Sequence, residues 1–272
     1  MDAFYISAAN GDRFCILHSP PAGATHKGCV LYVHPLAEEM NHSRRMASLQ
    51  ARALARSGYV VLQIDLLGCG DSSGDFADAT WDAWLDDIDL GLQWLTQRYG
   101  GLTWLWGVRS GCLLAAQSAA RSSGYALRLL LWQPVISGRQ HLHQFLRLRQ
   151  VSDVMHRGGK LGTEELLDQL KQGQMVEVAG YEMSPALANG LLSANMDDIS
   201  NIQDVVCLEV FASAQTQSHM ASPALEAQML RWMSKGIPVR SIAVEGQAFW
   251  QLPEAQTSTF LIEATLAALA AG

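Results

Sequence analysis

Residues 103–114 read Thr-Trp-Leu-Trp-Gly-Val-Arg-Ser-Gly-Cys-Leu-Leu, and they constrain the fold more than any other stretch of the chain. An apolar run typical of a buried strand leads into a turn bracketed by Gly107 and Gly111, and a run typical of a helix follows. Glycine has no Cβ, so these two glycines permit a very tight change of direction. We therefore expect a sharp strand-to-helix turn with Arg109 at its apex.

Strand-like and helix-like segments alternate along most of the chain. The expected strands cover residues 14–18, 29–34, 59–66, 102–106, 127–132, 205–211 and 239–244, and the expected helices cover 43–57, 80–98, 112–121, 223–234 and 257–271. Short strands that alternate with helices of this length are typical of a mostly parallel sheet covered on both faces. Thr80 is a suitable N-cap for its helix. A chain of 272 residues suits one large domain of this kind, which we expect to span residues 1–272.

The alternation stops between residues 138 and 201. Residues 141–154 and 163–173 have helical patterns, and residues 175–181 look extended. In open α/β sheets, ligands bind at the carboxyl ends of the strands. We therefore expect residues 138–201 to form a helical cap over that edge, with an ordinary crossover carrying extra helices as the alternative.

Two further motifs agree with the turn at residues 103–114. One strand ends in His34-Pro35, a pair that often begins a loop donating a backbone N–H to an oxyanion hole. Another ends at Asp65 and continues into a G-x-G-x-S loop at residues 68–72, which lacks the lysine of a phosphate-binding loop. Together the three motifs predict the α/β-hydrolase fold, with a mostly parallel central sheet, helices on both faces and an inserted helical cap.

The residues of a Ser-Asp-His triad are missing from their expected places. The nucleophile of this fold stands midway between the small residues of the turn, and here that position holds Arg109. The histidine should follow the last strand, but the sequence has no histidine after His219. The acid should follow strand 205–211, where residues 212–217 contain no carboxylate. Because general-base catalysis contributes about 10²–10⁴-fold, we expect a degenerate triad.

Three other residues are candidates for catalysis. A frame shifted by one residue makes Ser110 the nucleophile, although the β-branched Val108 then replaces a small flanking residue. Cys112 is the second candidate, since a helix N-terminus lowers the pKa of a thiol. His34 is the third candidate. His219 could act as a base only from the acid loop, where a surface histidine is the simpler interpretation.

The pocket expected around the turn contains one cation and two nearby carboxylates. Arg109 stands at the positive end of a helix dipole and therefore needs an anion. Glu38 or Glu39 could supply it internally; if both point away, Arg109 would bind a small carboxylate or phosphate. The expected lining residues are His34, Pro35, Leu36, Glu38, Glu39, Arg109, Ser110, Phe249 and Trp250.

Several linked segments resemble one bacterial family. The chain resembles the second type of exosortase-A-system-associated hydrolase. The resemblance is carried by residues 34–45, 68–76 and 79–85, by Trp106-Gly107 with Arg109, and by residues 178–182 and 249–251. The resemblance covers nearly the whole chain. It implies a host that makes exopolysaccharide and sorts exported proteins by a C-terminal signal, with a protein of that system as a candidate partner beside the small anion that Arg109 suggests.

Composition narrows the classes of protein that fit. A net charge of −7 disfavours a nucleic-acid partner, and no apolar stretch is long enough to form a transmembrane segment. The N-terminus lacks the pattern of a secretory signal, and five scattered cysteines without a CxxC pattern suit reduced thiols. We therefore expect a cytoplasmic protein without metal or cofactor. Our leading hypothesis is a non-catalytic binding or accessory protein; the alternatives are an ester or acyl hydrolase that uses Ser110 or Cys112, and a small-anion binding protein that uses Arg109.

Overall fold

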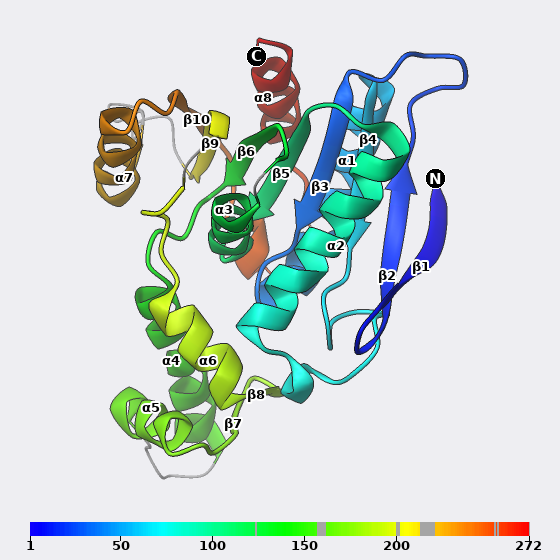
Figure 1. Cartoon of the computed structure of the whole chain (residues 1–272). Coiled ribbons are helices and arrows are strands. Elements are labelled where there is room, and N and C mark those ends of the chain that lie inside the picture. Colours follow the sequence, from blue (N-terminus) through cyan, green and yellow to red (C-terminus); the bar gives the residue numbers. More distant parts are fainter. Residues whose placement is uncertain are drawn as a thin grey trace.

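A computed structural model describes residues 1–122, 124–156, 162–199, 202–212, 221–252, 254 and 256–271, with the backbone alone for 150–156. Its centre is an eight-stranded sheet in the order β1-β2-β4-β3-β5-β6-β9-β10 (Figure 1). The pairs β1·β2 and β2·β4 are antiparallel and all the others are parallel. The predicted mostly parallel sheet is confirmed. Its strands are β1 (Asp2–Ala8), β2 (Gly11–His18), β3 (Gly28–Val33), β4 (Tyr59–Ile64), β5 (Thr103–Val108), β6 (Leu127–Trp132), β9 (Ile202–Phe211) and β10 (Val239–Glu245).

Helices cover both faces of this sheet. On one face, α1 (Glu38–Arg56) and α8 (Thr259–Ala270) pack over a cluster that includes Trp104, Trp106 and Trp132. On the other face lie α2 (Trp81–Tyr99), α3 (Gly111–Arg121) and α7 (Pro223–Ser234). Every residue of β3 and β5 is buried, which explains their continuous apolar sequences.

Most elements lie where the sequence places them. The bounds of β6 and α7 match the expected ranges. The Oγ1 atom of Thr80 accepts a hydrogen bond of 3.1 Å from the N–H of Ala83, so the predicted N-cap of the helix after Thr80 is confirmed. The largest differences outside residues 138–201 concern β1 and α1. Strand β1 was not expected, because only Ile6 in it is buried and it forms by pairing with β2. Helix α1 begins at Glu38 rather than at residue 43. Its first residues are mainly polar and lack an apolar period, so the sequence pattern did not reveal this earlier start.

In the described part of the interval between β6 and β9 lie five elements. They are α4 (Gly138–His156), α5 (Thr163–Lys171), β7 (Val176–Val178), β8 (Tyr181–Met183) and α6 (Pro185–Ser193). We call this interval, residues 138–199, the insert. Figure 1 shows it at the end of the sheet toward which the arrowhead of β3 points. Helix α6 was not predicted, although Ser184 before Pro185 is a usable start signal, and its Oγ accepts the N–H of Leu187 at 3.0 Å.

A buried ion pair ties the antiparallel edge of the sheet to α2. The Nε atom of Arg13, on β2, lies 2.7 Å from Oδ1 of Asp87, and both side chains are almost completely buried. The second oxygen of Asp87 accepts the backbone N–H of Leu67 at 2.7 Å. The loop after β4 is thereby fixed against the helix that follows it.

Candidate binding pocket at the strand-to-helix turn

Arg109 is at the apex of the turn between β5 and α3. Its φ of 54° is in the left-handed region, where few residues other than glycine are found. A Cβ on Gly107 would lie 2.6 Å from Cα of Cys112, and one on Gly111 would lie 2.4 Å from the carbonyl oxygen of Val33. Both positions therefore require glycine. The turn adopts the frame with Arg109 at its centre, and Ser110 already has helical dihedral angles.

Ser110 directs its hydroxyl toward the loop after β3. Its Oγ accepts the backbone N–H of Leu36 at 2.8 Å, and the residue is buried. In hydrolases of this fold, an N–H from this loop contributes to the oxyanion hole. Here that donor is already bonded to a side chain of the protein.

The other two catalytic candidates are also buried and bonded. The Sγ atom of Cys112 lies 3.5 Å from the carbonyl oxygen of Trp132, and burial raises the pKa of this thiol well above its usual value. The Nδ1 atom of His34 bonds to the carbonyl oxygen of Pro35 at 2.8 Å, while Nε2 accepts the N–H of Leu66 at 3.2 Å. Both ring nitrogens of His34 are therefore used to join the ends of β3 and β4.

The expected ion pair of the turn is present, and its carboxylate is Glu39. The Nε atom of Arg109 lies 3.1 Å from Oε1 of Glu39, and the two side chains are 14% and 19% exposed. The guanidinium also lies 5.4 Å from the centre of the Trp250 ring. Glu38 points elsewhere, because it accepts the hydroxyl of Tyr181 at 3.0 Å. Burial raises the pKa of Glu39, and the charge of Arg109 opposes that rise.

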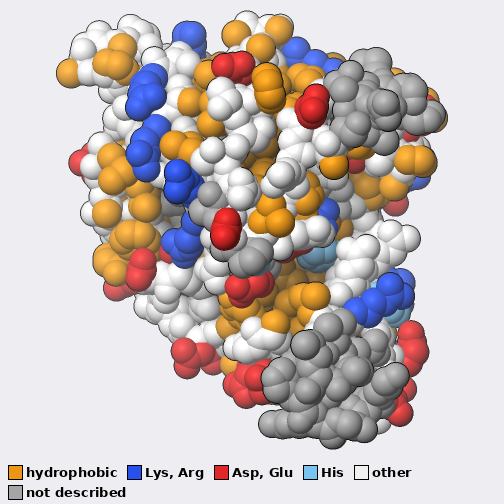
Figure 2. Space-filling view, turned by 180° about the vertical axis from the view of Figure 1, so that it is seen from behind, with side chains coloured by type: hydrophobic (Ala, Val, Ile, Leu, Met, Phe, Trp, Pro, Cys, Tyr) orange, Lys and Arg blue, Asp and Glu red, His pale blue; other side chains and the backbone are white. Residues whose placement is uncertain are grey.

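A cavity of about 360 Å³ opens beside this ion pair. Its walls come from the loop after β3, the first turns of α1, the turn at Arg109, α4 of the insert and the segment after β10. They consist of Leu36, Glu38, Glu39, His42, Arg109, His141, Gln144, Phe145, Leu148, Trp250 and Gln251. Figure 2 shows a hollowed region where hydrophobic side chains, carboxylates and a histidine come together.

The cavity includes some of the expected residues and omits others. Leu36, Glu38, Glu39, Arg109 and Trp250 line it, whereas His34, Pro35, Ser110 and Phe249 are not among its lining residues. The α4 residues His141, Phe145 and Leu148 also line the cavity and were not expected there, although their spacing of four and three places them on one helix face. His42 was not expected either, and it lines the cavity from α1, which begins before residue 43. Residues 213–217 of the expected acid loop and His219 lie outside the described residues.

His141 lies deep in the cavity as a neutral ring. Burial, and then the charge of Arg109, lower its pKa to about 3. Its Nε2 atom is 3.9 Å from Oε2 of Glu39, which is too long for a hydrogen bond. Among the described residues, Nδ1 of His141, Oε2 of Glu39 and Nε1 of Trp250 are buried polar atoms without a hydrogen-bond partner.

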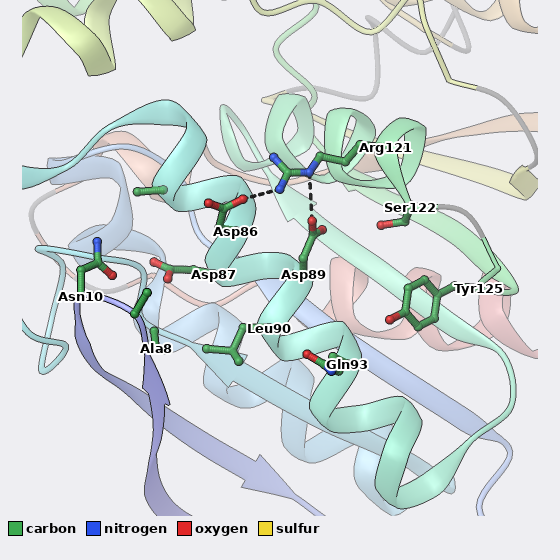
Figure 3. A pocket seen from close by; sticks show the side chains of 12 residues that line it. Ala8, Asn10, Asp86, Asp87, Asp89, Leu90, Gln93, Arg121, Ser122 and Tyr125 are labelled. Atoms are coloured by element: carbon green, nitrogen blue, oxygen red, sulfur yellow. Dashed lines mark hydrogen bonds and ion pairs between the residues drawn. The ribbon is translucent and has the colours of Figure 1, made fainter.

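A second hollow, of about 680 Å³, lies between the β1–β2 turn, α2 and α3 (Figure 3). Its charged groups are paired with one another. Arg121 binds Asp86 and, at 2.9 Å, Asp89, while Ser118 donates to Asp89 at 2.9 Å. Asp87 is bound by Arg13. Among the described residues that line this hollow, no buried side-chain polar atom is without a partner, in contrast to the cavity beside Arg109.

The fold is that of the α/β-hydrolases, as shown by the sheet order, the glycine-bracketed turn and the pocket at the carboxyl ends of the strands. The model of the family described as serine aminopeptidase, S33, matches residues 24–196, and the chain belongs to that family.

Solved structures agree with this assignment of the fold. Est1E from Butyrivibrio proteoclasticus, with bound ferulic acid, has a TM-score of 0.68 and 17% identity, over 98% of this chain and 96% of that one. A thermostable carboxyl esterase from Bacillus coagulans, in complex with glycerol, has a TM-score of 0.67 and 13% sequence identity, and the match covers 99% of this chain and 98% of the esterase. No curated protein sequence matches the chain. Within the described part of the chain, no helix is long and apolar enough to cross a membrane.

Removing the arginine should reveal the strength of the buried pair. We expect Arg109→Ala to lower the free energy of unfolding by about 3–5 kcal/mol, because it leaves the Glu39 carboxylate buried and unpaired. Adding Glu39→Gln to Arg109→Ala should cost much less than Glu39→Gln costs alone. Urea denaturation of the two single variants and the double variant measures this coupling.

Glu38→Gln is the matched control for that cycle. Glu38 is adjacent in sequence but bonds to Tyr181, so its effect should add to that of Arg109→Ala within about 0.5 kcal/mol. Strict additivity for Glu39 as well would show that the pair does not hold the turn.

His141 should make stability depend on pH. The unfolded chain takes up a proton below pH 6.5, whereas the folded protein resists it down to about pH 3, so stability falls as the pH is lowered through this range. We expect His141 to account for a loss of about 2 kcal/mol between pH 8 and pH 5. His141→Leu should remove this part of the pH dependence in urea titrations, and the neighbouring His143→Leu should retain it. Equal pH profiles for the wild type and His141→Leu would contradict the assignment.

Proposed function

We propose that this member of the α/β-hydrolase family is a non-catalytic binding or accessory protein. The observation that carries the proposal is Arg109 at the apex of the turn, held by Glu39 at 3.1 Å. A guanidinium is not a nucleophile, and this one is engaged in an ion pair. The position that attacks an ester in a working hydrolase therefore has a structural group instead.

Neither relocated nucleophile has favourable surroundings. The Oγ atom of Ser110 is buried and accepts the N–H of Leu36, and the thiol of Cys112 has a raised pKa. A useful general base has a pKa near the working pH, but that of His141 is lowered to about 3. The segment after β10, where the catalytic histidine belongs, contributes Trp250 to the cavity. These features favour binding over turnover.

We further propose that residues 138–201 cap the pocket and that residues 1–272 act as one domain. Helix α4 contributes His141, Gln144, Phe145 and Leu148 to the cavity wall, which supports the cap. The pairing of Arg109 with Glu39 makes the small-anion site the weaker alternative.

The biological setting that we propose rests on the resemblance of residues 34–45, 68–76 and 79–85 to the exosortase-associated family. On that basis, the protein serves exopolysaccharide synthesis or protein sorting from the cytoplasm. Deleting the gene should lower exopolysaccharide yield, measured as secreted hexose, and complementation with a Ser110→Ala variant should restore it. Normal yield in the deletion strain would contradict this setting.

Esterase assays test the non-catalytic proposal. We expect hydrolysis of p-nitrophenyl acetate and p-nitrophenyl octanoate at the rate of a buffer blank, because Arg109 stands at the position of the nucleophile and the segment after β10 has no histidine. Release of p-nitrophenol followed at pH 7–8 measures this. Turnover well above the blank that disappears in Ser110→Ala, but not in the control Ser118→Ala on the same helix, would establish a relocated nucleophile.

A further inference from the structure

We propose that the cavity beside Arg109 binds a neutral molecule that combines a hydroxyl group with an apolar body. This inference rests on the proposed function, in which the pocket holds a ligand without turning it over. It is carried by three features of the cavity: its apolar walls, its unpartnered polar atoms and its balance of charge.

The walls fit an apolar body of modest size. Leu36, Phe145, Leu148 and Trp250 provide aliphatic and aromatic surface from three different parts of the chain. A volume of 360 Å³ equals the share of about twelve molecules of liquid water. This leaves room for roughly a dozen heavy atoms. Leu148 is about half exposed and places an apolar side chain in the lining of the cavity where it meets solvent.

The unpartnered polar atoms specify a group that both donates and accepts. Oε2 of Glu39 accepts only, whereas the neutral ring of His141 offers one donor and one acceptor. The 3.9 Å between Oε2 of Glu39 and Nε2 of His141 is too long for direct bonding. With the proton on Nε2, an oxygen within hydrogen-bond distance of both atoms would donate to Oε2 of Glu39 and accept from His141. Nδ1, the ring nitrogen that is buried without a partner, would then remain an acceptor. A hydroxyl group meets both requirements, and a carboxylate or an ether meets only one.

The charge and the hydrogen-bonding groups of the lining disfavour ions of either sign. Arg109 is already neutralised by Glu39, and Glu38 adds a second carboxylate to the lining, so an entering anion would face more negative than positive charge. An ammonium group could donate to Oε2 of Glu39, but it has no lone pair with which to accept from His141 or from the Nε1–H of Trp250. A neutral ligand avoids both penalties, and the unpaired Nε1–H of Trp250 can donate to a second oxygen on it.

Three matched compounds test the proposal on the wild-type protein. They are 4-phenylbutan-1-ol, its methyl ether and 4-phenylbutanoate, with binding measured by isothermal titration calorimetry at pH 7.5. We expect the alcohol to bind about 3- to 10-fold more tightly than the ether, because the ether cannot donate to Glu39. The carboxylate should bind more weakly than the alcohol.

Variants then locate the binding site. His141→Leu should weaken binding of the alcohol about 3- to 10-fold, since it removes the group that donates to the hydroxyl and retains an apolar side chain. Tyr125→Phe, which removes a hydroxyl from the second hollow, is the control and should leave the affinity unchanged (Figure 3).

The outcomes separate this inference from the proposed function. Tighter binding of 4-phenylbutanoate than of the alcohol would overturn the neutral-ligand proposal and assign an anion to Arg109. Equal affinity of alcohol and ether, or no heat with any compound at millimolar concentration, would also overturn it. Turnover of the p-nitrophenyl esters would overturn the proposed function instead, whichever of the three compounds binds best.

Discussion

The ion pair between Arg109 and Glu39 is the interaction on which the site depends. A cation at the start of α3 opposes the dipole of that helix, and Glu39 supplies the compensating charge from the first turn of α1. The carboxylate itself is favourably placed at the N-terminus of α1. One contact thus satisfies two helix ends and fixes them against each other at the carboxyl edge of the sheet.

The rest of the pocket follows from that contact. With Arg109 at the apex, the hydroxyl of Ser110 bonds to Leu36 across the place where an oxyanion would bind. The positive charge beside His141 adds to the effect of burial and keeps that ring neutral. Trp250 lies against the guanidinium and brings the segment after β10 into the wall. The cavity beside the ion pair is therefore lined by apolar side chains together with buried polar atoms that have no partner among the described residues.

The sequence predicts the turn well because its constraints are local. Gly107 and Gly111 are required by contacts within a few residues or with the neighbouring strand, and this spacing places Arg109 without further information. The strands next to it are continuous apolar runs. The start of α1 was missed because its first turn is held by contacts with the pocket rather than by an apolar period, and β1 because its pairing with β2 needs no apolar pattern.

His141 was missed for a different reason. It lies in the insert, and the expected helical cap did not specify which face of α4 would turn toward Arg109. Only the folded chain shows that the ring meets Glu39 and Arg109. The choice between Glu38 and Glu39 was likewise left open, because a side chain's direction at a helix start depends on where the helix begins.

The buried pair also bears on how the protein can change in evolution. A serine at position 109 would leave the carboxylate of Glu39 buried without its cation, and it would still face Trp250 where a histidine is needed. A substitution of Glu39 made first would instead leave the guanidinium of Arg109 buried without its anion. Each single substitution at this pair therefore costs stability. Such mutual dependence means that positions 39 and 109 can change without loss of stability only when they change together.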